Sequence, residues 1–352
     1  MSRCEHDLSV ALLCTRGLPA SYGAFEQTVE KIVEYSKSSN PEICFLVATD
    51  KSLQMKEIEH TNVKRLFLKR SNGIGVIIYG LKSIILAYLM GVRTMVFFGY
   101  ALAPIFPLLK MIGTNVICNT DGFEWRRAKW GRVARFYFKC CEFICGRSNI
   151  QLVSDARTIQ RYYSIKYRAK STLIRYGADT YLRETSDTER YFVVVMRMEP
   201  ENNILTIVKA FSASNQTAKL YLIGPSTKYF EDEILEIIKG DPRIHFLGPI
   251  YDRQRLFQIR SKAMAYIHGH SVGGTNPTLV EACFIGKPVI SYFSSFNNEV
   301  LKGECRYFSD LDTLKSIFDE GIDLKLPTPP RLGEEYEWRK IVDNYVGLLQ
   351  NV

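Results

Sequence analysis

Short apolar runs alternate with amphipathic segments through the first half of the chain. Within residues 25–38, the apolar positions Val29, Ile32 and Val33 recur at helical spacing and predict the first helix. The runs that predict strands are residues 8–14, 43–48, 63–68, 94–98, 115–118, 150–153 and 172–174. Short apolar strands separated by helices predict a parallel sheet with helices on both faces.

The same alternation restarts after a polar, acidic stretch at residues 176–190. Strands are predicted at 192–195, 220–223, 244–247, 263–267 and 288–291, and helices at 204–212, 230–238, 253–259 and 277–284. A proline-rich piece (326–330) precedes a last helical segment (334–349). We therefore predict two Rossmann-like, doubly wound α/β domains, 1–180 and 181–332, that face a central ligand-binding cleft. We expect residues 333–352 to form a helix that packs back on the first domain.

The overall composition is typical of a globular protein, and a length of 352 residues is typical of two domains. The nine cysteines are odd in number and form no CxxC pair, which predicts reduced thiols in a cytoplasmic protein and no zinc site. The polar N-terminus does not resemble a signal peptide.

Residues 73–91 are apolar over nearly the length of a membrane span. Lys82 lies at the centre, where an unpaired charge costs about 3 kcal/mol in a bilayer. A predicted strand follows at once. We therefore expect a helix that is buried or touches a membrane, rather than one that crosses it.

Charge is distributed unevenly between the two halves. Residues 1–175 carry 26 Lys and Arg against 13 Asp and Glu, a net of +13, whereas residues 176–352 carry 20 against 24, a net of −4. An uneven distribution of charge indicates what a protein binds rather than how it folds. It predicts that the first half attracts an anionic partner, such as lipid headgroups, a lipid diphosphate or nucleic acid.

The segment from His268 to Ala282, HGHSVGGTNPTLVEA, lies between a predicted strand and a predicted helix. Its glycines allow backbone to approach a ligand closely, Asn276 suits the N-cap, and Pro277 suits the first helical position. Free amides and the positive end of the helix dipole then suit a phosphate. Glu281, about one turn into the helix, is placed to accept hydrogen bonds from ribose hydroxyls. The alternative is an ordinary loop-to-helix junction with a surface glutamate.

The segment VVVMRMEPENN, from Val193 to Asn203, places Arg197 directly after a buried strand. An arginine there can bind a diphosphate through two parallel hydrogen bonds and offset the charge of a leaving group. The alternative is an exposed structural arginine.

Two further segments follow strands in the first half. TRGLPASYGAFE, from Thr15 to Glu26, is a glycine-bearing turn that does not fit GxGxxG. NTDGFEWRRAKW, from Asn119 to Trp130, places Asp121 after a strand end. Six cations and interleaved aromatic residues follow between Glu124 and Lys139, which suits a membrane interface, a lipid diphosphate or nucleic acid. A solvated basic helix is the alternative.

Two apparent metal motifs have simpler explanations. The DLD sequence at Asp310 to Asp312 precedes a helical run, where aspartate commonly caps the helix. His268 and His270 have no third ligand nearby in the sequence, so we expect them to line the cleft or the core. No metal site and no cofactor are predicted.

These four segments together resemble the family 4 retaining glycosyltransferases, which have the GT-B fold. More narrowly, TRGLPASYGAFE, NTDGFEWRRAKW, PENN and HSVGGTNPTLVEA resemble bacterial rhamnosyltransferases of capsule and cell-wall polysaccharide synthesis. The resemblance implies a thymidine diphosphate-rhamnose donor bound by the second domain. It also implies an acceptor sugar on undecaprenyl diphosphate, held by the basic first domain at the inner face of the cytoplasmic membrane.

The resemblance also implies residue roles. Asp121, Arg197 and Glu281 would be catalytic, with Asp121 orienting the acceptor hydroxyl or accepting its proton. Donor-binding residues would be Gly23, Asn202, His268, Gly273, Gly274, Thr275 and Asn276. Acceptor-binding residues would be Tyr22, Glu124, Trp125 and Arg127.

Three positions depart from the broader family. The broader family has a glutamate eight residues before the position of Glu281, where this chain has Gly273. It also has a lysine a few residues after the position of Arg197, where this chain has Glu, Asn and Asn at 201–203. The family's first-domain histidine is absent, with Asn, Thr and Asp at 119–121. The narrower rhamnosyltransferase group shares these changes.

Three other functions use similar features. A GT-B sugar-nucleotide epimerase would share the cleft but would need no lipid acceptor. A membrane-bound scaffold would keep the fold without activity. A nucleic-acid-binding protein would show steeply salt-dependent binding, and we expect none.

Overall fold

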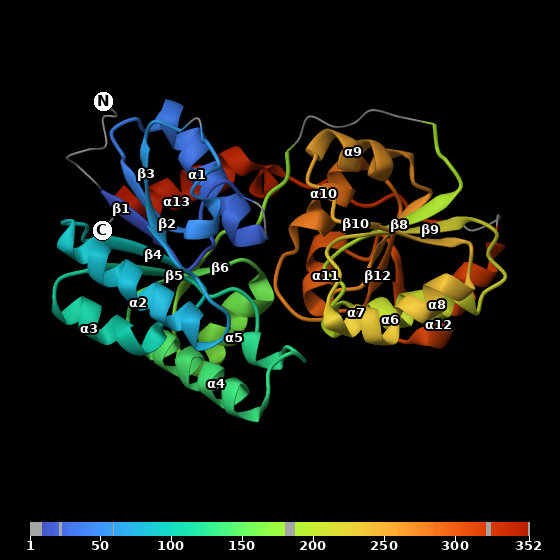
Figure 1. The fold of residues 1–352 in the computed structure, drawn as a ribbon, viewed down its shortest axis with the longest axis horizontal. Coiled ribbons are helices and arrows are strands. Elements are labelled where there is room, and N and C mark those ends of the chain that lie inside the picture. The colour runs from blue at the N-terminus through green and yellow to red at the C-terminus, as the bar shows by residue number, and fades with distance from the viewer. Residues whose placement is uncertain (1–8, 21–22, 59, 180–186, 322–324, 351–352) are drawn as a thin grey trace. The chain divides into compact units, whose positions relative to one another are not determined.

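The computed structural model describes residues 9–20, 23–58, 60–179, 187–321 and 325–350. The chain divides into two compact units. The first unit comprises Met1–Trp125, Arg132–Tyr176 and Glu337–Val352, and the second comprises Arg126–Gly131 and Gly177–Tyr336. Each unit is an α/β domain built on one parallel sheet, as the alternation of apolar runs predicts (Figure 1).

The first unit contains a seven-stranded sheet in the order β3-β2-β1-β4-β5-β6-β7. All neighbouring strands pair in parallel, with Leu12 opposite both Val47 and Val96. The central strands read as continuous apolar runs because helices cover both faces. The strands are β1 (Val10–Leu13), β2 (Phe45–Asp50), β3 (Val63–Leu68), β4 (Thr94–Phe98), β5 (Asn115–Asn119), β6 (Gln151–Ser154) and β7 (Ser171–Leu173).

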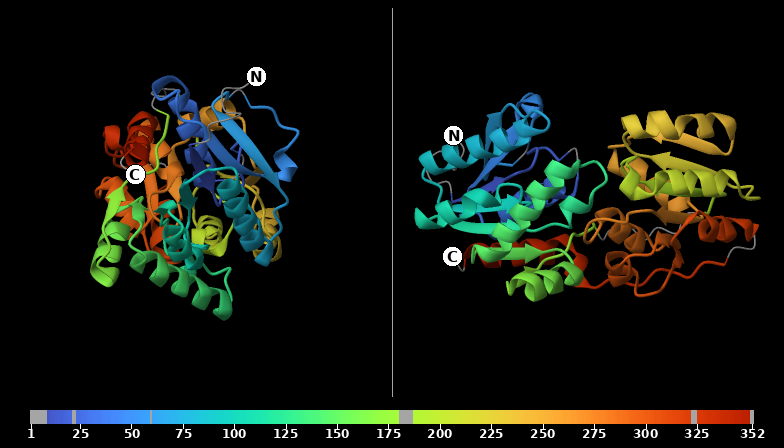
Figure 2. Two further views of the ribbon diagram at one scale, coloured as in Figure 1. Left: turned by 90° about the vertical axis from the view of Figure 1, so that its left-hand side faces the viewer. Right: turned by 90° about the horizontal axis from the view of Figure 1, so that it is seen from below.

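Helices from distant parts of the sequence cover each face of this sheet. On one face, α1 (Ala24–Ser39) packs with the C-terminal helix α13 (Trp338–Gln350), and both contribute to one core with the strands. The opposite face carries α2 (Ile74–Leu89), α3 (Phe106–Met111), α4 (Arg132–Arg147) and α5 (Arg157–Tyr167), as Figures 1 and 2 show.

The second unit contains a six-stranded parallel sheet in the order β10-β9-β8-β11-β12-β13. Its strands are β8 (Tyr191–Val195), β9 (Lys219–Ile223), β10 (Ile244–Gly248), β11 (Ala265–His268), β12 (Val289–Tyr292) and β13 (Arg306–Phe308). One apolar core lies under α6 (Ile204–Ser212), α7 (Lys228–Glu233), α8 (Leu235–Gly240) and α12 (Leu311–Asp319). The core on the other face involves α9 (Arg253–Lys262), α10 (Pro277–Ile285) and α11 (Ser295–Leu301).

Most predicted strands begin and end within two residues of the observed ones, and α6 occupies the predicted range. The helix predicted at 230–238 was wrong, because the chain breaks at Ile234 into α7 and α8. The sequence also gave no prediction for β13, which has only three residues and therefore shows no period. Asp310 is confirmed as an N-cap, since its side chain accepts from Thr313 N and a capping box forms.

The apolar stretch at 73–91 forms the sixteen-residue helix α2. Within the described ranges, no helix has the length and apolar character needed to cross a membrane. Among the described residues, seven cysteines are free, but Cys44 is disulfide-bonded, so the expectation of reduced thiols was wrong for that residue.

The packing of α13 gives a first prediction. Ile341 is 1% exposed within the core that α13 shares with α1. Ile341→Ala should lower the free energy of unfolding of the first unit by about 2–5 kcal/mol, because it opens a cavity. Urea unfolding followed by tryptophan fluorescence measures this change. Lys340→Ala, at the neighbouring exposed position, is the control, and equal effects of the two substitutions would contradict the observed packing.

Candidate functional site

In the second unit, the strand order reverses beside β8, because β8 pairs with both β9 and β11. Ligands of open parallel sheets bind at the carboxyl ends of the strands at such a reversal. The segments that follow the two strands are residues 196–203 after β8 and 269–276 after β11. The two motifs singled out in the second half of the sequence therefore lie side by side.

Backbone contacts hold these two segments together. A Cβ atom on Gly269 would lie 2.1 Å from the carbonyl oxygen of Asn202, so only glycine fits there. Asn203 Nδ2 donates to the Gly269 carbonyl at 2.8 Å. The amide and the hydroxyl of Ser271 both donate to the Glu201 carbonyl, at 3.0 and 2.8 Å. These contacts fix the position of the loop that leads into α10.

The N-terminus of α10 has the geometry of an anion site. Asn276 is confirmed as the N-cap, since its Oδ1 accepts from Thr278 N at 3.0 Å, and Pro277 occupies the first turn. Gly273 has φ +137°, a conformation that favours glycine. In the described part of the chain, the N–H groups of Gly273 and Gly274 have no hydrogen-bond acceptor. Free amides at a helix N-terminus bind phosphate well.

Arg197 follows β8 by two residues and lies close to this loop. Its side chain is 30% exposed and forms an ion pair with Glu199, with Nη1 and Oε1 3.6 Å apart. Asn202 Nδ2 donates to the Arg197 carbonyl at 2.8 Å, which holds the backbone of the segment in place. Asn202 therefore acts on Arg197 through the backbone, a role that the sequence did not indicate.

His268 and His270 stack at the end of β11, with ring centroids 4.6 Å apart. Burial lowers the pKa of His268 to about 3, and nearby Arg260 contributes to the shift. Burial also lowers the pKa of His270, with smaller contributions from His268, Arg197 and Arg127. Both imidazoles are thus neutral at pH 7. His268 Nε2 and His270 Nδ1 are buried without a hydrogen-bond partner among the described residues.

Glu281 lies on α10 and forms an ion pair with the buried Arg260. Arg260 also donates to the Thr278 carbonyl at 2.6 Å, so the guanidinium is anchored to the same helix. The side chain of Glu281 is 31% exposed. Its carboxylate is therefore held in one orientation and can still accept hydrogen bonds from a ligand.

Sequence reasoning assigned no role to Glu201, although its position just after a strand end in PENN was a usable signal. Its side chain is 2% exposed, and Arg127 Nη1, within the second unit, lies 3.7 Å from Oε1. Neither carboxylate oxygen has a hydrogen-bond partner among the described residues. Burial raises the pKa of Glu201, with Glu199 adding to the rise and Arg127 and Lys129 opposing it.

Asp121 lies at the end of β5 in the first unit with φ +50°, a conformation that aspartate tolerates better than most residues. Its amide donates to Asn119 Oδ1 at 2.9 Å, and Asn119 Nδ2 donates to Tyr345 of α13 at 2.8 Å. The C-terminal helix therefore supports the backbone at the predicted catalytic aspartate.

Trp125 is held by the first unit's own side chains. Its indole N–H donates to Glu142 Oε2 at 2.7 Å. Glu142 is fully buried and also accepts from Tyr162 at 2.6 Å, Tyr167 at 2.5 Å and Lys166 at 3.1 Å. The predicted acceptor role of Trp125 is therefore limited to its ring faces. The backbone amide of Glu124 donates to the hydroxyl of Tyr100 at 3.0 Å.

The turn after β1 is positioned by carboxylates of α1. Glu26 accepts from the Arg16 amide at 2.7 Å and Glu30 from the Ala20 amide at 3.0 Å. Gly23 is the N-cap of α1 with φ −165°, which any residue adopts, and an added Cβ would meet only the Glu26 carboxylate at 3.6 Å. Tyr22 lies outside the described residues.

Comparisons with known proteins agree with this fold. Residues 183–308 match the family model described as "Glycosyl transferases group 1", and residues 8–179 match one described as "Domain of unknown function (DUF1972)". No curated protein sequence matches the chain significantly.

Solved structures resemble the whole chain. Sucrose-phosphate synthase from Thermosynechococcus elongatus has a TM-score of 0.78 at 15% identity, and the alignment covers 98% of this chain and 99% of that one. HepE from Anabaena, in complex with UDP, has a TM-score of 0.70 at 12% identity, covering 98% and 100%. AviGT4, a glycosyltransferase involved in avilamycin A biosynthesis, has a TM-score of 0.60 at 15% identity, covering 98% of each chain.

These comparisons define the class of protein. The chain has the GT-B fold, and residues 183–308 of its second unit match the model of group 1 glycosyltransferases. The family match supports glycosyltransferase function.

The buried carboxylate gives a second prediction. Because the folded pKa of Glu201 is raised, the folded chain holds the proton more tightly than the unfolded chain. The ionised carboxylate therefore lowers the free energy of unfolding at pH values above the pKa of Glu201 in the folded chain. This effect disappears once the pH falls below the pKa of Glu201 in the unfolded chain. Glu201→Gln should raise Tm at pH 7.5 and leave it nearly unchanged near pH 4. Thermal unfolding at both pH values measures this, with Glu236→Gln on exposed α8 as the control; an equal gain at both pH values would contradict the assignment.

Proposed function

We propose that the chain is a retaining glycosyltransferase that moves L-rhamnose from thymidine diphosphate-rhamnose to a sugar on undecaprenyl diphosphate. The observation that carries this proposal is that the segment of Arg197 and the loop that leads into α10 follow the neighbouring strands β8 and β11 and are held together by backbone contacts. This arrangement suits one diphosphate. The structurally similar HepE from Anabaena forms crystalline complexes with UDP and with UDP-glucose, which supports a nucleotide-sugar donor.

Departure of the nucleoside diphosphate is the step that this site would promote. As the glycosidic bond breaks, negative charge grows on the diphosphate oxygens. Arg197 and the amides of Gly273, Gly274 and Thr275 would stabilise that charge more strongly in the transition state than in the bound donor. The mechanism we propose uses these groups in place of a metal ion.

The remaining groups of the second unit would orient the donor. Glu281, fixed by Arg260, would accept hydrogen bonds from the ribose. The unpartnered nitrogens of His268 and His270 would contact the sugar or the phosphate. A neutral imidazole accepts or donates a hydrogen bond without adding charge, which suits sugar hydroxyls.

The acceptor would be bound by groups that follow β5. Asp121 would orient the acceptor hydroxyl and accept its proton. Glu124 and Arg127 would position the acceptor sugar, and the ring of Trp125, fixed by Glu142, would stack against it. The resemblance of these motifs to rhamnosyltransferases supports the choice of donor sugar.

A peripheral position on the inner face of the cytoplasmic membrane is part of this proposal. The helices α2, α3 and α4 contain one carboxylate, Glu142, which is fully buried. Apart from Pro107, their exposed residues are cations and large apolar side chains: Lys82, Lys110, Arg132, Arg135, Lys139, Arg147, Ile74, Ile78, Ile85, Leu89, Leu108, Met111, Val133, Phe136 and Phe143. A surface of this composition binds anionic lipid headgroups and inserts its apolar side chains at the interface.

The role of Arg197 gives a third prediction. Arg197→Ala should lower kcat/KM by about 2–4 kcal/mol of transition-state stabilisation, mainly through kcat, because the charge it offsets develops during the reaction. Transfer from sugar nucleotides to a synthetic lipid diphosphate-sugar, measured by mass spectrometry, tests this. Arg255→Ala, at an exposed position on α9, should behave like the wild type. Normal turnover by the Arg197 variant would rule out its proposed role, and conversion of donor without acceptor would identify an epimerase.

The basic helices give a fourth prediction. Replacing Arg132, Arg135 and Lys139 together by Gln should weaken binding to anionic vesicles by about fivefold per cation, about 1 kcal/mol each. Sedimentation with phosphatidylglycerol vesicles measures the partition coefficient. A matched triple replacement of exposed cations in the second unit, Lys219, Arg255 and Lys325, is the control. Equal losses for the two triple variants would mean that total charge, rather than this surface, governs binding.

A further inference from the structure

Arg260 is a buried cation beside the carboxylate that is proposed to bind the ribose of the donor. It lies in the last turn of α9 and is 4% exposed. Its Nη1 donates to Glu281 Oε2, and its Nη2 donates to the Thr278 carbonyl at 2.6 Å. Both partners belong to α10, so one guanidinium from α9 fixes the position of a carboxylate on the neighbouring helix.

The surroundings of Arg260 hold its guanidinium in this orientation. Its Cζ atom lies 5.2 Å from the centroid of the Tyr266 ring. The Tyr266 hydroxyl lies 2.8 Å from Thr278 Oγ1, which donates to Asn276 Oδ1 at 2.8 Å. These side chains join α9, β11 and the first turn of α10. Because the pair of Arg260 and Glu281 belongs to this connected set of contacts, we expect it to persist when a ligand binds.

This pairing changes what Glu281 offers to a ligand. Its Oε2 already accepts from Arg260. In the part of the chain that the structure describes, Oε1 has no hydrogen-bond donor. The side chain of Glu281 is partly exposed, so a ligand can reach the carboxylate. The oxygen that this ligand finds unpaired is Oε1.

Ribose and 2′-deoxyribose make different demands on a carboxylate. The neighbouring 2′- and 3′-hydroxyls of ribose can donate one hydrogen bond to each carboxylate oxygen, whereas 2′-deoxyribose has only the 3′-hydroxyl. A carboxylate with one oxygen already paired satisfies one hydroxyl. The second hydroxyl of ribose would then enter the site without this acceptor, and a polar group that loses its partner on binding lowers affinity.

We propose that Arg260 makes the second unit selective for 2′-deoxyribonucleoside diphosphates, because it holds Glu281 Oε2 and leaves one oxygen for the 3′-hydroxyl. Arg260 touches no substrate and determines specificity through Glu281. This inference rests on the proposed function, in which Glu281 binds the sugar ring of a thymidine diphosphate donor. It adds the residue that discriminates between such a donor and a ribonucleotide donor.

The test is isothermal titration of the full-length chain with two pairs of nucleotides whose members differ only in the 2′-hydroxyl. One pair is UDP and dUDP, and the other is 5-methyluridine diphosphate and dTDP. The wild type should bind the deoxy member of each pair about 5- to 100-fold more tightly, the range expected for one hydroxyl left without a partner. Because the members of a pair share their base and diphosphate, their ratio of affinities reports the ribose contact alone.

Two substitutions test whether Arg260 causes this preference. Arg260→Met removes the donors but keeps a long side chain, so both oxygens of Glu281 become available and the preference should fall to about twofold or less. Arg260→Lys keeps a cation that can hold Oε2 and should retain part of the preference. Arg255→Met, at an exposed position of the same helix, is the matched control and should behave like the wild type. Thermal unfolding of each variant shows that it is folded.

The ratio of affinities separates this role from a structural one, because loss of a structural contact would weaken both members of a pair equally. Two results would overturn the inference: equal binding of both members by the wild type, or an unchanged ratio in folded Arg260→Met. The first requires no variant, so the test does not depend on the folding of Arg260→Met.

The proposed function fails on different results. A preference for deoxy nucleotides in a chain that transfers no sugar would contradict the transferase and leave the role of Arg260 intact. Sugar transfer by a chain that binds both members of each pair equally would contradict only the role of Arg260.

Discussion

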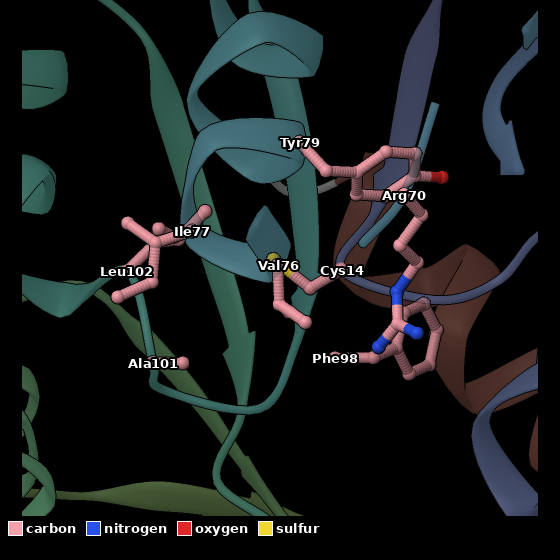
Figure 3. Close-up of a pocket in the computed structure, with 8 residues that line it drawn as sticks. All are labelled: Cys14, Arg70, Val76, Ile77, Tyr79, Phe98, Ala101 and Leu102. Carbon is pink, nitrogen blue, oxygen red and sulfur yellow. The ribbon is translucent and has the colours of Figure 1, made fainter. Parts of the chain in front are cut away.

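The candidate site depends on one topological constraint, the reversal of strand order beside the first strand of a parallel sheet. Parallel strands place all their carboxyl ends at one edge, and the connecting segments diverge where the order reverses. In the second unit this happens between β8 and β11, and in the first unit between β1 and β4. Residues far apart in sequence, such as Arg197 and Gly273, or Arg70 and Cys14 in a small cavity of the first unit (Figure 3), are brought to a common edge by this constraint.

Backbone proximity then determines what the site of the second unit can bind. Gly269 lies against the Asn202 carbonyl, and a Cβ on Gly224 would lie 1.8 Å from the Met196 carbonyl. Both contacts hold the segment after β8 against its neighbours, so that its polar groups have a fixed position. The same segment carries Arg197 and the buried Glu201. The positions of these two charged residues therefore depend on Gly269 and Gly224, because only glycine permits the close backbone contacts.

Buried polar groups are fully hydrogen-bonded at some places in the structure and not at others. Glu142 in the first unit accepts four hydrogen bonds and fixes the indole of Trp125. Glu201, His268 and Tyr79 retain atoms without partners in the described structure. Unsatisfied buried groups are costly, so those next to the loop that leads into α10 are candidates for contact with a ligand, whereas a satisfied network such as that of Glu142 supports the structure.

The sequence by itself determined the α/β class, the two parallel sheets and the caps at Asn276 and Asp310, because apolar periodicity and capping act over a few residues. It also indicated Arg197 and the loop before α10, since both directly follow strands. Only the tertiary structure showed the pairing of Glu281 with Arg260, the burial of Glu201 and the small cavity that Arg70 lines. These depend on contacts between segments tens of residues apart, which no local pattern records. The sequence also did not predict the break at Ile234 or the short strand β13, because packing overrides weak local preference in segments of a few residues.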